Sequence, residues 1–85
     1  MAELKDEAER VLRLAYPGSR IALTRGPNGR VSGVVEWQGF QTLDHVDRQR
    51  HLAKTLRESI DPALLSDVGV VLTLTPDEAA GEEAA

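Results

Sequence analysis

The chain has 85 residues, which is the length of one small domain. It contains no cysteine, which excludes a disulfide framework, a cysteine nucleophile and a thiolate metal site. Fourteen acidic and ten basic residues give a formal net charge of −4, with four acids inside residues 77–83 and most basic residues inside residues 10–57. Such asymmetry fits an ordinary solvated surface, and it also fits a surface for nucleic acid or an acidic partner. The charged N-terminal segment and the short apolar runs predict a cytoplasmic protein without signal peptide or membrane anchor.

Two amphipathic helices are predicted, over residues 2–15 and 43–60. The first has one apolar face, made of Leu4, Ala8, Val11, Leu12 and Ala15. It ends at Tyr16-Pro17-Gly18, because proline disfavours helical geometry in the residue before it. The apolar stripe of the second consists of Leu43, Val46, Leu52, Ala53, Leu56 and Ile60. Asp61-Pro62 ends this helix and predicts a short extra turn over residues 62–66.

Three strands are predicted from alternating apolar residues, over residues 19–25, 30–37 and 68–75. The first two flank Gly26-Pro27-Asn28-Gly29, whose Asn-Gly pair is a strong hairpin signal. In the last strand the expected buried face consists of Val68, Val70, Leu72 and Leu74. Residues 77–85 have no large apolar side chain, so we expect a disordered acidic tail after a single domain over residues 1–76.

This element order predicts an α+β fold, a small αββα(α)β sandwich in which two main helices cover one face of a three-stranded mixed sheet. The last strand follows a helical crossover and is expected to lie parallel to a hairpin strand. Leu12, Val35, Leu56 and Leu72 are the predicted core residues, because each lies on the apolar face of its element.

Three segments resemble the BolA-like proteins, whose fold is related to the type II KH domain. Trp37-Gln38-Gly39-Phe40 is similar to the family's aromatic-x-Gly step before its second helix. Residues 47–56, DRQRHLAKTL, resemble its Arg-(His/Gln)-Arg helix motif, and residues 68–76, VGVVLTLTP, resemble its last strand ending in Thr-x-Thr-Pro. The resemblance covers roughly residues 2–78 and implies a BolA-like domain.

The resemblance also implies where a metal would bind. The family typically carries a histidine just after the first residue of the last strand, which helps to ligate an iron–sulfur cluster shared with a monothiol glutaredoxin. This chain has Gly69 at that place, and its 26–29 turn has neither histidine nor cysteine. We therefore expect no cofactor and no iron–sulfur ligation, and a monothiol glutaredoxin is a doubtful partner.

The candidate contact residues lie on and before the second helix. Arg50, Lys54 and Arg57 recur at i, i+4 and i+7 and form a basic stripe, with Arg48 on the same polar side. Such a stripe could bind phosphates or an acidic partner, or it could only keep the domain soluble. Trp37 and Phe40 flank Gly39 and are expected either in the core or, if both are exposed, in a docking patch.

Nothing in the sequence supports an enzyme. His45 and His51 are six residues apart on one helix and point in directions about 120° apart, so they are not expected to chelate one metal. The turn Gly26–Gly29 matches the Gly-x-x-Gly of KH domains, but that clamp joins two helices whereas this turn joins two strands. No nucleophile elbow or phosphate loop is present.

Two functions are left open by these observations. The first is a non-catalytic BolA-like adaptor or regulatory domain that acts through contacts with an unknown protein partner. The alternative is a KH-related nucleic-acid-binding module that uses the basic second helix. A homodimer that pairs exposed strand edges is a third possibility.

Overall fold

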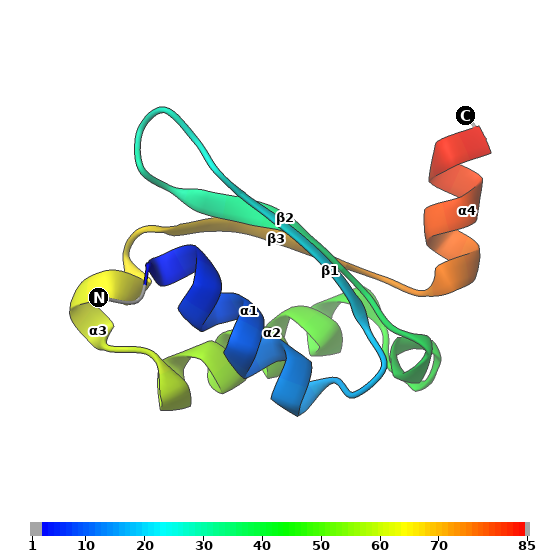
Figure 1. Ribbon diagram of the computed structural model, residues 1–85. Helices are drawn as coiled ribbons and strands as arrows, with labels where there is room; N and C mark the ends of the chain where they lie inside the picture. Colours follow the sequence, from blue (N-terminus) through cyan, green and yellow to red (C-terminus); the bar gives the residue numbers. More distant parts are fainter. Residues whose placement is uncertain (1–2, 85) are drawn as a thin grey trace.

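The computed structural model describes residues 3–84, with side chains for residues 3–81. Its elements are α1 (Leu4–Ala15), β1 (Arg20–Arg25), β2 (Val31–Glu36), the 3-10 helix η1 (Gln38–Thr42), α2 (His45–Ser59), α3 (Pro62–Leu65), β3 (Val68–Leu74) and α4 (Pro76–Ala84). Helices α1 and α2 lie together against one face of the sheet, and α4 stands at one end on the side opposite to them (Figure 1). None of the helices within residues 3–84 has the length and apolar character that a membrane crossing needs.

The three strands form one mixed sheet in the order β1-β2-β3. Strands β1 and β2 are an antiparallel hairpin, with Ile21 opposite Val35, and β3 lies parallel to β2 after the crossover through α2 and α3. The predicted fold class is therefore confirmed. The hairpin closes because Gly29 takes a φ of 81° and Asn28 Oδ1 accepts a hydrogen bond from the Arg30 N–H at 3.0 Å.

The core lies between the sheet and the two main helices. Leu12, Val35 and Leu56 are buried there as predicted. Tyr16 and Phe40 are fully buried beside them, with ring centroids 5.1 Å apart. This aromatic cluster is completed by Trp37, whose Nε1 donates to the Pro17 carbonyl at 2.9 Å, and it joins the end of α1 to the start of η1.

The buried face of β3 differs from the prediction after its first residue. Val68 packs against the core as expected, but Val71 and Thr73 are buried while Leu72 is 43% exposed. The pairing shows why: Val71 is three positions after Val68, whereas their partners on β2, Val31 and Gly33, are two positions apart. This one extra residue is a β-bulge, and it turns each later side chain to the opposite face. The prediction of Leu72 as a core residue is therefore wrong.

The tail also differs from the prediction, because residues 76–84 form α4 where disorder was expected. Thr75 and Glu78 make a reciprocal capping box: the Glu78 N–H donates to Thr75 Oγ1 at 3.2 Å, and the Thr75 N–H donates to Glu78 Oε1 at 2.8 Å. Pro76 stands at the first helical position, where its missing N–H costs nothing. The last residue of the predicted tail, Ala85, lies outside the described residues.

Candidate functional site

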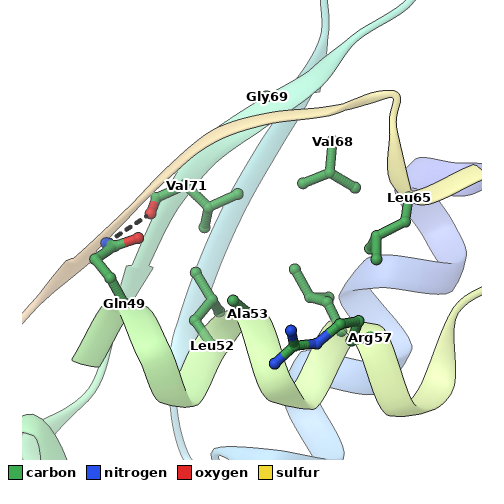
Figure 2. A pocket seen from close by; sticks show the side chains of 9 residues that line it. Gln49, Leu52, Ala53, Arg57, Leu65, Val68, Gly69 and Val71 are labelled. Atoms are coloured by element: carbon green, nitrogen blue, oxygen red, sulfur yellow. Dashed lines mark hydrogen bonds between the residues drawn. The ribbon is translucent and has the colours of Figure 1, made fainter. Parts of the chain in front are cut away.

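A groove runs between α2 and the free edge of β3, which is the last strand of the sheet. Its volume is about 250 Å³, and it is lined by Gln49, Leu52, Ala53, Leu56, Arg57, Leu65, Val68, Gly69 and Val71. Val68 and Val71 point from β3 toward α2, and the Arg57 side chain lies along the helix at the mouth (Figure 2). We call this surface the α2–β3 groove. Arg57 is the single charged side chain among its lining residues.

The groove continues onto the exposed side of α2. A shallower hollow there is lined by His45, Val46, Gln49, Arg50 and Ala53, so it shares Gln49 and Ala53 with the groove. Val46 is 59% exposed and Ala53 is exposed, although both were predicted in the buried stripe. The helix turns Leu52 and Leu56 to the core instead, which leaves Val46 and Ala53 on the β3 side as apolar surface between two arginines.

The outward carbonyls of β3 are covered by side chains of α2. Gln49 Nε2 donates to the Val71 carbonyl at 3.1 Å, drawn as the dashed line in Figure 2, and it lies 3.3 Å from Thr73 Oγ1. Arg48 Nη1 lies 3.4 Å from the Thr73 carbonyl. These contacts hold α2 beside the strand and satisfy the buried Thr73 hydroxyl, so the wall of the groove is fixed.

Arg48 is buried, which corrects the expectation that it is a surface contact residue. Its Nε donates to the carbonyls of Phe40 at 3.0 Å and Leu43 at 2.9 Å, and its Nη1 donates to Glu78 Oε1 at 2.7 Å. The guanidinium thus satisfies the end of η1 and holds the first turn of α4. A buried cation survives here because several acceptors surround it.

The Glu78 carboxylate accepts hydrogen bonds from Arg48 of α2 and from Thr75, the residue before α4. The Thr75 N–H and then the Arg48 guanidinium stabilise its carboxylate and lower its pKa from 4.5 to about 2. His45 Nε2 lies 3.5 Å from Glu78 Oε2. This cluster anchors α4 to α2, and its charges compensate one another.

The other predicted contact residues are divided between surface and interior. Arg50, Lys54 and Arg57 are exposed on α2, but Lys54 lies 4.0 Å from Glu58 and lines neither hollow. Arg50 and Arg57 flank the apolar surface around Ala53. Phe40 is fully buried and Trp37 is partly buried against the core, so the alternative of core packing is the correct one for this pair.

The two histidines occupy separate environments. His45 faces Glu78, whereas His51 Nδ1 lies 2.7 Å from the Tyr16 hydroxyl at the α1 side of α2. Burial raises the pKa of Tyr16, which keeps this hydroxyl protonated as a hydrogen-bonding group. Within the part of the chain that the structure describes, no three His, Asp or Glu side chains gather as ligands for a metal ion.

The residues near the groove do not fit an iron–sulfur cluster bound in the way that the resemblance implies. Gly69 lines the groove and has no side chain. In the 26–29 turn, Asn28 Oδ1 is engaged by the Arg30 N–H. Imidazole and thiolate are the side chains that bind such clusters, and the turn has neither.

Two residues of the site were missed by the sequence analysis. Gln49 was overlooked because its role depends on β3, 22 residues away in the chain. Glu78 was assigned to a disordered tail, although the Thr75-Pro76-Asp77-Glu78 sequence has the spacing of a capping box and was a usable signal.

Comparisons with known proteins bear on the fold. Scans against protein-family profiles and against curated proteins find no match. Among solved structures, the fold is similar to the crystal structure of a bol-like protein from Babesia bovis, with a TM-score of 0.57 and 19% sequence identity. The similarity covers 93% of this chain and 92% of that chain. The expectation drawn from residues 37–40, 47–56 and 68–76 is thereby confirmed for the architecture, and this chain has the BolA-like fold.

Proposed function

We propose that the chain is a non-catalytic adaptor or regulatory domain that binds an acidic, apolar segment of a partner protein in the α2–β3 groove, without ligating an iron–sulfur cluster. One observation carries the proposal. The groove and its continuation on α2 form an apolar surface, and the exposed arginines Arg50 and Arg57 line it. An apolar side chain of the partner fills the groove, and carboxylates of the partner meet the guanidinium groups.

The chemistry of the groove supports binding rather than catalysis. Its lining consists of aliphatic side chains, the Gln49 amide and the Arg57 guanidinium. An arginine stays protonated and is a poor acid or base, and the Gln49 amide is held by β3. The lining therefore supplies recognition groups and no pair for proton transfer or nucleophilic attack.

A protein partner is favoured over nucleic acid by the position of the aromatic rings. Tyr16, Trp37 and Phe40 pack against one another in the core cluster, and none of them lines the groove. Single-stranded nucleic acid is bound through stacked bases on exposed aromatic rings. The arginines beside the hairpin turn, Arg25 and Arg30, lie in the sheet layer and not on α2 (Figure 1). They therefore do not enlarge the basic stripe of α2 into a longer surface for phosphates.

Peptide display on the immobilised protein tests the proposal. We expect enriched peptides that combine a large apolar residue with Asp or Glu. Their binding should be lost in Ala53→Arg, which fills the groove, and weakened at least tenfold in Arg57→Glu. Lys54→Glu makes the same charge change outside the groove and should bind as the parent does. Peptides that bind Ala53→Arg equally well would refute this location.

The nucleic-acid alternative is tested by fluorescence anisotropy with a labelled single-stranded RNA and a DNA duplex. The proposal predicts no specific binding at 150 mM salt. Tight binding that weakens steeply with salt and is lost in Arg50→Ala would establish the alternative, because each neutralised phosphate releases counterions.

The absence of iron–sulfur ligation is tested with a cluster-loaded monothiol glutaredoxin. We expect its visible absorption and circular dichroism to stay unchanged when the protein is added. A new cluster spectrum that disappears in His45→Ala or His51→Ala would overturn this part of the proposal.

A further inference from the structure

The outer face of the sheet is a second apolar surface, separate from the α2–β3 groove. Helices α1 and α2 cover the inner face, and the outer face is open (Figure 1). The β-bulge places Val70, Leu72 and Leu74 there, with Val70 70% and Leu72 43% exposed. Ala22 and Val34 continue this surface across the sheet, because Ala22 pairs with Val34 and Val34 pairs with Leu72. A contiguous apolar face of this kind marks an interaction site.

The outer face has three rows of side chains that run across the strands. The middle row is apolar and consists of Ala22, Val34 and Leu72. The row nearest to α4 contains Arg20, Glu36 and Leu74. The row nearest to the hairpin turn contains the pair Thr24 and Ser32, and the exposed Val70 lies in the bulge of β3 at this end. Successive rows are about 7 Å apart. The middle row is therefore a centre with a charged end on one side and a hydroxyl-bearing end on the other.

Opposite charges project beyond the two ends of this face. The hairpin turn follows the last row directly and carries Arg25 and Arg30, both exposed. Helix α4 begins two residues after Leu74 at the other end. Its sequence contains the exposed Asp77 and the acids at positions 82 and 83, in addition to Glu78, which Arg48 already holds. A hollow of about 590 Å³ separates α4 from the face, lined by Arg20, Ala22, Val34, Glu36, Leu74 and Ala79 among others.

We infer that the outer face binds a second copy of this chain in a two-fold dimer, with the acidic α4 of each copy against the basic hairpin turn of the other. A two-fold axis that lies along the middle row places Leu72 opposite Leu72 and Val34 opposite Val34 of the second copy. The same rotation places Val70 opposite Leu74, and it brings Arg25 and Arg30 to the hollow beside α4. One symmetry operation thus satisfies the apolar row and both charged ends.

In this dimer the two charged residues of the outer face lie beside each other. Arg20 and Glu36 are cross-strand partners, and both face the Thr24 and Ser32 end of the second copy, where hydroxyls are available. The α2–β3 groove lies on the helical layer, so a partner protein in the groove and the second copy on the sheet do not compete (Figures 1 and 2).

Sedimentation equilibrium from about 10 to 500 µM, at 20 and 500 mM NaCl, tests this dimer. We expect a reversible transition from the 9.3 kDa monomer to a species of twice that mass, weaker at high salt. Leu72→Lys places two like charges on the axis and should raise the dissociation constant at least tenfold. Leu14→Lys makes the same change at a residue of α1 that is 72% exposed, and it should dimerise as the parent does. Far-ultraviolet circular dichroism verifies that both variants are folded.

A charge exchange tests the contact between α4 and the hairpin turn. One variant carries Arg25→Glu with Arg30→Glu, and the other carries Asp77→Lys with Ala80→Lys, all at exposed positions. Each variant alone should dimerise at least tenfold more weakly, and an equimolar mixture should regain the parent affinity as a heterodimer. A chain that stays monomeric at 500 µM in low salt, a dimer unaffected by Leu72→Lys, or a mixture without recovery would each overturn the inference.

Discussion

The side chains of Arg48 and Glu78 join two elements that are 30 residues apart in the chain, with Arg48 Nη1 2.7 Å from Glu78 Oε1. The same guanidinium donates to two carbonyls at the end of η1. It lies on the side of α2 that faces the sheet, next to Gln49, which lines the α2–β3 groove. Together with the Gln49 contacts to β3, this buried cation therefore helps to hold α2, and with it one wall of the groove, in place.

Arg48→Ala should lower the free energy of unfolding by roughly 2–4 kcal/mol, because the carbonyls of Phe40 and Leu43 lose their buried donor. Arg50→Ala, on the exposed side of the same helix, should change it by less than about 0.5 kcal/mol. Urea unfolding followed by circular dichroism measures both. Equal effects of the two substitutions would show that the contacts of Arg48 do not stabilise the fold.

The stability that Glu78 contributes should depend on acid pH. Its pKa is about 2 in the folded chain and 4.5 in its ordinary state, so the folded state stabilises the ionised carboxylate relative to the unfolded state. The contribution is therefore complete above pH 4.5 and is lost as the pH falls toward 2. The melting temperatures of the parent and Glu78→Gln should differ at pH 7 and converge near pH 2. The comparison is made in a His45→Ala background, because that imidazole also faces the carboxylate. A difference that is independent of pH would contradict the role of the ionised form.

Two neighbouring valines of β3 should differ in how much their truncation to alanine lowers the free energy of unfolding. Val71→Ala removes buried methyl groups and should cost roughly 1–3 kcal/mol, while Val70→Ala, at an exposed position, should cost less than about 0.5 kcal/mol. For comparison, Leu56→Ala in the core should cost about 2–5 kcal/mol. Thermal melting of the three variants shows which side chains of β3 face the core. The reverse order for the two valines would mean that the strand has no bulge.

Gly33→Ala should prevent normal pairing of the hairpin. A Cβ at Gly33 would lie 1.9 Å from the Ala22 carbonyl oxygen, a backbone atom of the paired strand that cannot move aside alone. Gly69→Ala is the matched control on β3, because its Cβ would meet nothing nearer than the Val31 carbonyl oxygen at 3.4 Å. We expect a large fall in melting temperature for the first variant and a small change for the second. Similar melting temperatures would show that β1 is not held so close to Gly33.

The sequence was sufficient to predict the elements whose two faces differ in polarity. Helix α1 and the hairpin were predicted to within two residues, because Leu12 and Val35 lie on faces that polar neighbours define. Strand β3 has apolar residues at both parities, Val70 and Val71 among them. The pattern therefore does not indicate which face of the strand is buried. Because the sequence is apolar at both parities, it also contains no sign of a one-residue bulge.

The site was only partly predictable for a related reason. Spacing on the helix identified Arg50 and Arg57 as exposed, and they flank the groove. The same spacing placed Arg48 on the surface, because a helical pattern records polarity and contains no information on distant acceptors such as the Thr73 carbonyl. The groove itself is formed by two elements, and neither sequence segment alone reveals it.

The covered carbonyls of β3 limit how this sheet can grow. Gln49 and Arg48 contact the Val71 and Thr73 carbonyls at the β3 edge. A further strand therefore cannot form regular hydrogen bonds with these carbonyls. The opposite edge, along β1, is the one left for strand addition. A sheet with one open edge joins at most one further sheet of its kind and then stops. A cross-β fibril needs pairing on both sides of every strand, so the native fold blocks fibril growth for as long as α2 keeps its place.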